Sequence, residues 1–205
     1  MESLIDEKKK YEKLWSDKDY ESFSPGEHLW GCFEPLIEKG KCLIDFGCGS
    51  GKSIHQYLAL DLQVQLVDIA SNCLSSQAQF SMNLAPDQIQ FHEACLWDLP
   101  DALKPAEYMV CVDVMEHIPP HKVDDTLQSM AEKHLGLGFF AICLVPDNWG
   151  EAINETLHLS LFSPEEWLER INQHWKIARY ELIIEDQYLL VFVEAHSADS
   201  LSKTI

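Results

Sequence analysis

The sequence predicts an α/β fold: a doubly wound, seven-stranded, mostly parallel sheet with helices on both faces. Short apolar runs alternate with longer segments of helical periodicity through most of the 205 residues, which is the pattern of repeated β-α-β units. Near the C-terminus, two apolar runs flank the short polar turn at residues 185–187 and so predict an antiparallel C-terminal hairpin. A glycine-rich turn follows the first predicted strand, where sheets of this kind bind ligands.

The secondary-structure elements follow in order from periodicity and turn signals. An N-terminal helix is expected over about residues 4–15, and a second over about 27–38, after the Ser24-Pro25-Gly26 turn. A later helix has a clear start, because Ser163, Pro164 and Glu166 form a capping-box pattern. Strands are expected near residues 42–46, 63–67, 89–92, 107–112, 138–145, 176–184 and 188–194, and core helices near 51–60, 71–83, 120–134 and 164–173.

Length and composition predict a single domain. A chain of 205 residues, 46% of them apolar, can bury one sizeable core. We expect residues 1–195 to form this domain, with lid helices in 1–38 and the ligand-binding core in 40–195, and residues 196–205 to form a flexible tail. No uninterrupted apolar stretch approaches the ~18 residues typical of a membrane span, so no membrane association is expected.

Net charge and cysteine content indicate which partners and which cellular location to expect. The formal net charge is −19, and the only basic run is Lys8–Lys10, which argues against a nucleic-acid partner because such binding needs clustered Lys and Arg. The seven cysteines contain no C-x-x-C pair, and the N-terminus lacks the pattern of a secretory signal. These features predict free thiols and a cytoplasmic location.

The first candidate ligand site is the turn Asp45-Phe46-Gly47-Cys48-Gly49-Ser50-Gly51, which follows the apolar run Cys42-Leu43-Ile44. Its glycines permit backbone conformations closed to other residues and allow a ligand to approach the main chain. Asp45 would repel a pyrophosphate but can accept hydrogen bonds from an ammonium group. Taken alone, the heptapeptide is also compatible with an ordinary turn.

The second candidate is Asp68, which ends the predicted strand Val64-Gln65-Leu66-Val67. It lies a little short of the ~20 residues usual between a nucleotide-binding turn and the acid that binds a ribose. A carboxylate at this place can accept both vicinal ribose hydroxyls. The alternative is a solvated Asp at the end of a strand.

Four segments together resemble the class I S-adenosylmethionine-dependent methyltransferases, in particular the small-molecule, ubiquinone-biosynthesis-like "type 11/12" subgroup. They are the D-x-G-x-G-x-G turn, the "EVLEH"-like run within residues 109–119, the loop 92–100 and the "H…FSPEE"-like segment 158–166. The resemblance implies the cofactor S-adenosyl-L-methionine and the strand order 3-2-1-4-5-7-6. It implies these cofactor-binding residues: Asp45, Gly47, Cys48, Gly49, Gly51, Asp68, Ile69, Cys95, Leu96, Trp97 and Asp113.

One of these positions departs from the family pattern. Many relatives have Asp where Cys95 stands, and that Asp accepts a hydrogen bond from the adenine amino group. Because a thiol is a poor acceptor, adenine recognition is expected to rest more on main-chain groups near Leu96 and on packing by Trp97.

Candidate catalytic residues are His117 and His158, with Glu116 and Asp113 as further candidates for a general base. Histidine titrates nearest neutral pH, although each of these histidines can instead brace its loop. The spacing His117-x-x-x-His121 resembles a metal pair, but Pro119 and Pro120 interrupt a helix between them, so no metal is predicted.

The predicted reaction is methyl transfer from S-adenosylmethionine to an O or N atom of a small-molecule acceptor, such as a sugar or a secondary metabolite. Tyr11, Trp15 and Tyr20 are candidates for a lid over the cofactor, or for simple packing against the core. Three alternatives stay open: a methyltransferase acting on a protein or tRNA partner, a non-catalytic cofactor-binding scaffold subunit, and S-adenosylmethionine chemistry other than methyl transfer.

Overall fold

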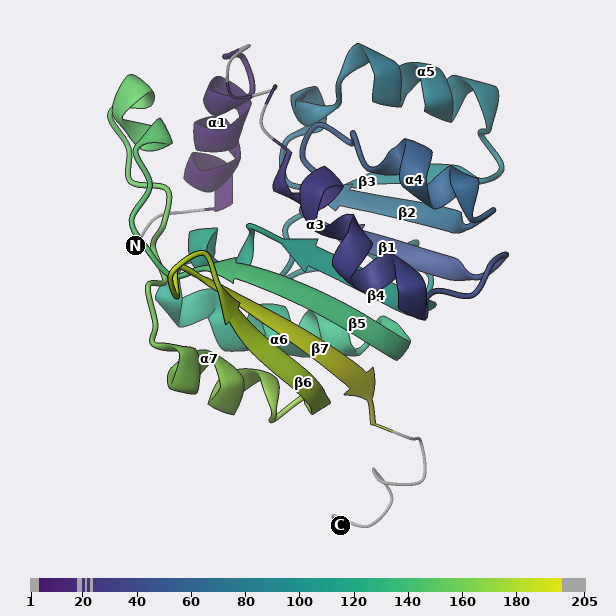
Figure 1. Ribbon diagram of the computed structural model, residues 1–205. Coiled ribbons are helices and arrows are strands. Elements are labelled where there is room, and N and C mark those ends of the chain that lie inside the picture. Colours follow the sequence, from purple (N-terminus) through teal and green to yellow (C-terminus); the bar gives the residue numbers. More distant parts are fainter. Residues whose placement is uncertain (1–3, 18–19, 21, 23, 197–205) are drawn as a thin grey trace.

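A seven-stranded sheet in the order β3-β2-β1-β4-β5-β7-β6 forms the centre of the protein (Figure 1). The computed structural model describes residues 4–17, 20, 22 and 24–196. Strands β1 to β5 pair in parallel, whereas β7 is antiparallel to both β5 and β6. The predicted fold class and strand order are therefore confirmed. The strands are β1 (Cys42–Phe46), β2 (Gln63–Asp68), β3 (Ile89–Glu93), β4 (Ala106–Val112), β5 (His134–Cys143), β6 (Trp175–Ile183) and β7 (Tyr188–Ala195).

Helices cover both faces of this sheet and lie close to the predicted ranges. The α-helices are α1 (Leu4–Leu14), α3 (Pro25–Phe33), α4 (Ile54–Ala59), α5 (Ser76–Leu84), α6 (Val123–Ala131) and α7 (Pro164–Ile171). The shorter 3-10 turns are η1 (Glu34–Leu36), η2 (Ser71–Cys73), η3 (Met115–His117), η4 (Pro120–Lys122) and η5 (Trp149–Ile153). The capping box predicted at the start of α7 is present, because Ser163 and Glu166 each bond to the other's backbone N–H.

Several boundaries differ from the sequence prediction: the helix expected near 71–83 begins at Ser76, after η2, and the helix expected over 27–38 ends at Phe33. The helix expected near 51–60 begins only at Ile54, because Gly51, with φ of +68°, belongs to the preceding turn. The helix expected near 120–134 begins at Val123, after a 3-10 turn that starts with Pro120. The strand expected near 138–145 spans His134–Cys143, because its first residues pair with the start of β4.

Two apolar clusters hold the layers together. On one face α3 and α4 pack onto the sheet, and Phe33, Tyr57 and Phe139 are among the fully buried side chains there. On the other face α6 and α7 contribute Leu127 and Trp167 (Figure 1). Within the described residues, no helix is long and apolar enough to cross a membrane. The predicted tail at 196–205 lies outside the described part except for His196.

Helix α1 lies over the carboxyl ends of the parallel strands, beside η5 (Figure 1). The Nζ of Lys13 donates to the Ile153 carbonyl (3.1 Å), and on the other side Asn72 Nδ2 donates to the Glu12 carbonyl (2.8 Å). Leu14 is buried against Ile153. The helix thus connects the loop after β5 with the turn after β2, and it covers the edge of the sheet where parallel α/β folds bind ligands.

Candidate active site

The glycine turn after β1 is held against β2 by its backbone. The amides of Gly47 and Cys48 both donate to the Val67 carbonyl, at 2.8 and 3.0 Å. Gly47 has φ of +74°, and a Cβ there would lie 2.4 Å from a methyl group of Val114. Only glycine meets both conditions. The turn therefore lies flat under the crevice and presents main chain instead of side chains.

Asp68 ends β2 directly beside this turn. Its Oδ2 accepts from the Gly49 amide and its Oδ1 from the Ala70 amide, each at 3.0 Å. The side chain is buried, and burial raises the pKa of Asp68 to about 6 although the two amides act against that shift. Each carboxylate oxygen keeps a second lone pair, so Asp68 can still accept from the hydroxyls of a ligand.

Asp45 ends β1 on the other side of the turn. The Tyr57 hydroxyl donates to its Oδ2 (2.8 Å). Burial raises the pKa of Asp45 to about 7, and the charge of Asp68 adds to the rise while the Tyr57 bond opposes it. Burial and the charge of Asp68 thus disfavour ionisation of Asp45, and a cation beside Asp45 would offset both effects.

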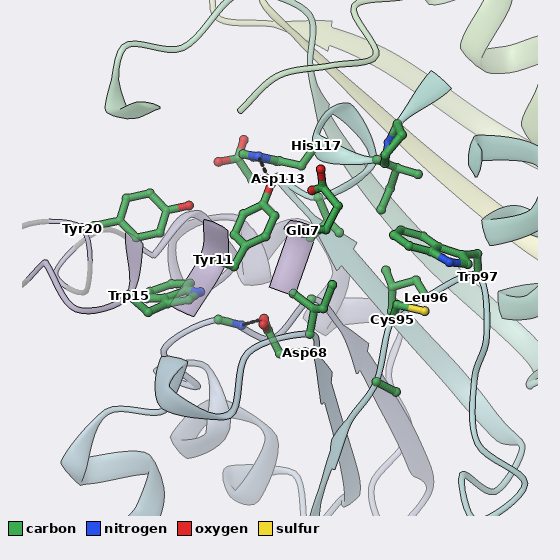
Figure 2. Close-up of a pocket in the computed structure, with 17 residues that line it drawn as sticks. Glu7, Tyr11, Trp15, Tyr20, Asp68, Cys95, Leu96, Trp97, Asp113 and His117 are labelled. Carbon is green, nitrogen blue, oxygen red and sulfur yellow. Dashed lines mark hydrogen bonds between the residues drawn. The ribbon is translucent and has the colours of Figure 1, made fainter. Parts of the chain in front are cut away.

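A cavity that is partly open to solvent has Asp68 in its lining. Figure 2 shows Asp68 at its base, with Cys95, Leu96 and Trp97 to one side and the aromatic residues of the N-terminal segment to the other. An acid faces an apolar wall formed by Leu96 and Trp97. This combination fits a ribose that carries a flat, apolar-faced base.

Two further hollows adjoin this cavity and share residues with it. The second is lined by Asp45, Cys48, Gly47 and Gly49, together with the chain around Ser24–Gly26. The third is lined by Asp147, Trp149, His158 and Tyr188 on the side of β5 and β7. Asp113 lines all three hollows. It therefore stands at the junction of the crevice.

Asp113 has an unusual backbone conformation and a firm side-chain contact. Its φ is +59°, which is uncommon for a residue other than glycine and often marks a functional position. The Tyr188 hydroxyl donates to its Oδ1 at 2.6 Å. Asp113 thus has one oxygen fixed by Tyr188, and its carboxylate faces the space where the hollows meet.

The N-terminal segment closes the crevice from above. The Tyr11 hydroxyl lies 3.0 Å from His117 Nδ1 (Figure 2). Trp15 packs on the glycine turn, where a Cβ at Gly49 would come within 3.0 Å of the indole. Tyr20 contacts Trp15 edge-on and also Trp149, with ring centroids 4.7 and 5.6 Å apart. Tyr11, Trp15 and Tyr20 therefore line the cavity, and Tyr20 also packs against Trp15 and Trp149.

The two predicted catalytic histidines lie side by side, with ring centroids 4.7 Å apart. His158 Nδ1 lies 2.6 Å from the Val145 carbonyl, so this nitrogen carries the proton and a neutral ring has its lone pair on Nε2. Burial, followed by the neighbouring His158, lowers the pKa of His117 to about 4, so His117 is neutral at pH 7. His117 Nδ1 is occupied by Tyr11, whereas His158 lines the third hollow.

Glu116 lies fully buried beneath the histidines. Its Oε1 accepts from the Cys143 amide at 2.9 Å, and its Oε2 has no hydrogen-bond partner among the described residues. Burial, and then the nearby Asp113, raise the pKa of Glu116 well above its usual value. Ligand atoms of Glu116, His117 and His158 lie within 4.8 Å of one another, so these three groups could hold a metal ion. The His117–His121 pair considered from spacing is not brought together in this way.

Most of the predicted cofactor residues gather around this crevice. Gly51 does not line the three hollows: a Cβ there would contact Ala78 of α5 at 2.9 Å, so this glycine serves close packing below the turn. Sequence reasoning missed Tyr188, which no local motif marks, and Glu7, which lines the cavity one helical turn before Tyr11. The main cavity is lined by Gly47, Gly49, Asp68, Ile69, Cys95, Leu96, Trp97, Asp113 and His117, the second hollow by Asp45 and Cys48, and the third by His158.

Comparison with known proteins identifies a methyltransferase domain in the chain. Residues 43–133 match the family described as methyltransferase domain, a span that includes the glycine turn, Asp68 and the segment from Asp113 to His117. The strand order around this span is the one expected from the resemblance to class I S-adenosylmethionine-dependent methyltransferases. None of the curated proteins compared with the chain matched it.

Several solved structures share the fold at low sequence identity. A complex from Haloferax volcanii between the Trm112 methyltransferase activator and a candidate methyltransferase superposes with a TM-score of 0.70 at 15% identity, over 89% of this chain and 96% of that one. Magnesium protoporphyrin IX methyltransferase from Synechocystis, with bound S-adenosylhomocysteine, gives 0.64 at 14% identity over 92% and 93%. Phosphoethanolamine N-methyltransferase 2 of Haemonchus contortus, with bound S-adenosylmethionine, gives 0.69 at 14% identity over 95% and 58%.

Proposed function

We propose that the enzyme transfers the methyl group of S-adenosylmethionine to an N or O atom of a small-molecule acceptor that occupies the third hollow. The observation that carries this proposal is the position of Asp113, which lines the two hollows of the cofactor crevice and also the third hollow beside His158 and Tyr188. A small molecule in the third hollow would therefore lie next to the cofactor crevice.

The residues present fit the cofactor. We assign Asp68 to the ribose hydroxyls, the wall at Leu96 and Trp97 to the adenine, and Asp45 to the amino group of the methionine end. The raised pKa of Asp45 supports this assignment, because an ammonium group beside it would offset the burial and the nearby charge of Asp68 that raise this pKa. Cys95, at 6% exposure, lines the wall but offers a poor acceptor for the adenine amino group.

The chain's own residues would align the acceptor and remove its proton. S-adenosylmethionine, when bound, supplies a methyl group already activated by the sulfonium, so the protein mainly provides position and exclusion of water. We assign proton removal to His158, because its Nδ1 proton is fixed by the Val145 carbonyl and Nε2 is left as the base. His117, held by Tyr11, would fasten the α1 lid.

Charge and closure favour a small acceptor over a nucleic acid. Within the described residues, no Lys or Arg lines any of the three hollows, and the net charge is −19. A phosphate-rich partner such as a nucleic acid instead requires clustered Lys and Arg side chains. We also propose a cytoplasmic location, because all seven cysteines are free thiols.

A protein partner is the second candidate. It rests on the similarity to the Haloferax volcanii complex, in which an activator protein is present. A methyltransferase that needs such a subunit would be inactive alone on every small acceptor and active once the subunit is added.

A two-stage experiment tests the proposal. Calorimetric titration of the purified chain with S-adenosylmethionine and S-adenosylhomocysteine is expected to give micromolar, one-to-one binding of both. A screen of small amines, alcohols and phenols, read by mass spectrometry for a methyl gain, is then expected to find turnover that the His158→Gln variant loses. Cofactor binding without turnover of any small acceptor, together with methylation of a protein or tRNA fraction, would refute the proposal.

A further inference from the structure

The crevice around Asp113 is strongly acidic. Its lining includes Asp45, Asp68 and Asp147 besides Asp113, and within the described residues no Lys or Arg lines it. Lys10 of α1 is buried and paired with Glu7, with 2.7 Å between Lys10 Nζ and Glu7 Oε2. A bound S-adenosylmethionine brings two positive groups and one carboxylate, which offsets only part of this charge.

The hollow beside His158 has its own pair of acids. Asp113 stands at the inner end, with one oxygen fixed by the Tyr188 hydroxyl at 2.6 Å. Asp147 accepts from the Gly150 amide at 3.1 Å and from the His158 amide at 3.2 Å. Although burial opposes it, these amides lower the pKa of Asp147, so its carboxylate is charged at neutral pH. An anionic acceptor would meet the carboxyl groups of both residues here.

Aromatic groups complete the same hollow. Trp149 and Tyr188 line it, and Tyr20 contacts Trp149 edge-on. Burial, followed by the nearby Asp113, raises the pKa of both Tyr20 and Tyr188. Rings beside carboxylates are a favourable setting for an ammonium group, because the ring faces attract a cation.

We propose that the methyl acceptor is a small amine, bound as an ammonium by Asp113 and Asp147 beside Trp149, with Tyr188 as the residue that positions Asp113. This inference rests on the proposed function and specifies its substrate class. The positive φ of Asp113 is consistent with it, since the strain keeps the carboxylate at the junction of the three hollows.

The proposed methyl transfer balances in atoms and charge, with the amine, His158 and the cofactor as its participants. The bound ammonium gives one proton to His158 Nε2, and the freed nitrogen lone pair forms the new N–C bond with the methyl carbon. The S–C bond breaks as its electron pair returns to sulfur, which leaves a neutral thioether. The methylated nitrogen leaves as an ammonium with one positive charge, and His158 passes its proton to solvent.

The test compares three probes of equal size on the full chain saturated with S-adenosylhomocysteine. They are phenethylamine, phenethyl alcohol and phenylacetate, which share a skeleton and differ in charge. We expect the amine to bind at least tenfold more tightly than the alcohol and the acid, as measured by calorimetry. Equal binding of the three, tighter binding of the alcohol or the acid, or no binding of the amine at millimolar concentration would overturn the proposal.

Two single-residue variants test whether Asp147 and Tyr188 determine the preference for the amine without disturbing the cofactor site. Asp147→Asn and Tyr188→Phe are each expected to reduce the preference for the amine over the alcohol at least fivefold, with S-adenosylhomocysteine affinity unchanged within twofold. Asp87→Asn, an exposed acid outside the crevice, is the matched control and should keep the full preference. A preference that survives in both crevice variants would contradict the assignment.

The same data distinguish the two levels of inference. If S-adenosylhomocysteine binds and the amine preference is absent, only the substrate class is wrong. If S-adenosylhomocysteine itself does not bind, both the proposed function and the proposed amine site are refuted.

Discussion

Replacing Asp68 with Ala is the perturbation for which the structure gives the clearest expected magnitude. The carboxylate is 8% exposed and accepts from the Gly49 and Ala70 amides at 3.0 Å each. In the proposed complex it also accepts from the ribose hydroxyls of the cofactor. A hydrogen bond to a charged group contributes roughly 1.5–3 kcal/mol, so the variant should bind S-adenosylhomocysteine about 10- to 150-fold more weakly.

The same substitution also affects folding, and the assay must separate the two effects. Two buried amides lose their acceptor, and each such loss costs about 1–3 kcal/mol of stability. Urea unfolding therefore accompanies the calorimetry, which is done at pH 8, where Asp68 is ionised, and on protein shown to be folded. Asp68→Asn keeps an acceptor for one amide and should be intermediate, whereas the exposed Asp87→Asn should match the wild type. A folded Asp68→Ala variant with affinity within twofold of wild type would refute the ribose assignment.

Three further predictions follow from the same geometry. Because the folded-state pKa values of Asp45 (about 7) and Asp68 (about 6) are raised above the unfolded value of about 3.9, each of these carboxyls lowers the free energy of unfolding of the cofactor-free protein as the pH rises from 5 to 8, whereas His117 and His134, with pKa values lowered to about 4, act in the opposite direction. The difference in free energy of unfolding between wild type and Asp45→Asn should therefore decrease over this pH range in urea titrations, and a difference that does not change with pH would contradict the raised pKa of Asp45. His158→Gln should lower kcat at least about hundredfold with unchanged S-adenosylhomocysteine affinity, and normal turnover would exclude it as the base. Tyr11→Phe removes a hydrogen bond worth about 1 kcal/mol and should speed release of S-adenosylhomocysteine about fivefold in surface plasmon resonance, whereas unchanged release would separate Tyr11 from the lid.

Much of the fold could be predicted from the sequence because its signals are local. The alternation of apolar runs with helical segments marks the β-α-β order, and the polar turn at 185–187 marks the hairpin. The boundaries that differed depend on contacts between distant residues. β5 begins at His134 because its first residues pair with β4, which no periodicity reveals.

Some residues of the candidate site could likewise be predicted from the sequence, and others could not. Asp45, Asp68 and the glycines could be found because each follows a strand directly, and parallel strands bring their carboxyl ends together. Tyr188 could not, since its role depends on β7 lying next to β5, which places its hydroxyl on Asp113. The different settings of His117 and His158 also come from tertiary contacts, with Tyr11 in one case and the Val145 carbonyl in the other.

The most direct test of the account is a crystal structure of the protein with S-adenosylhomocysteine. We predict the ribose hydroxyls on Asp68, the adenine against Leu96 and Trp97, the amino group near Asp45, and the sulfur facing Asp113. A ligand bound elsewhere, or one whose sulfur points away from the hollow that contains His158, would contradict it.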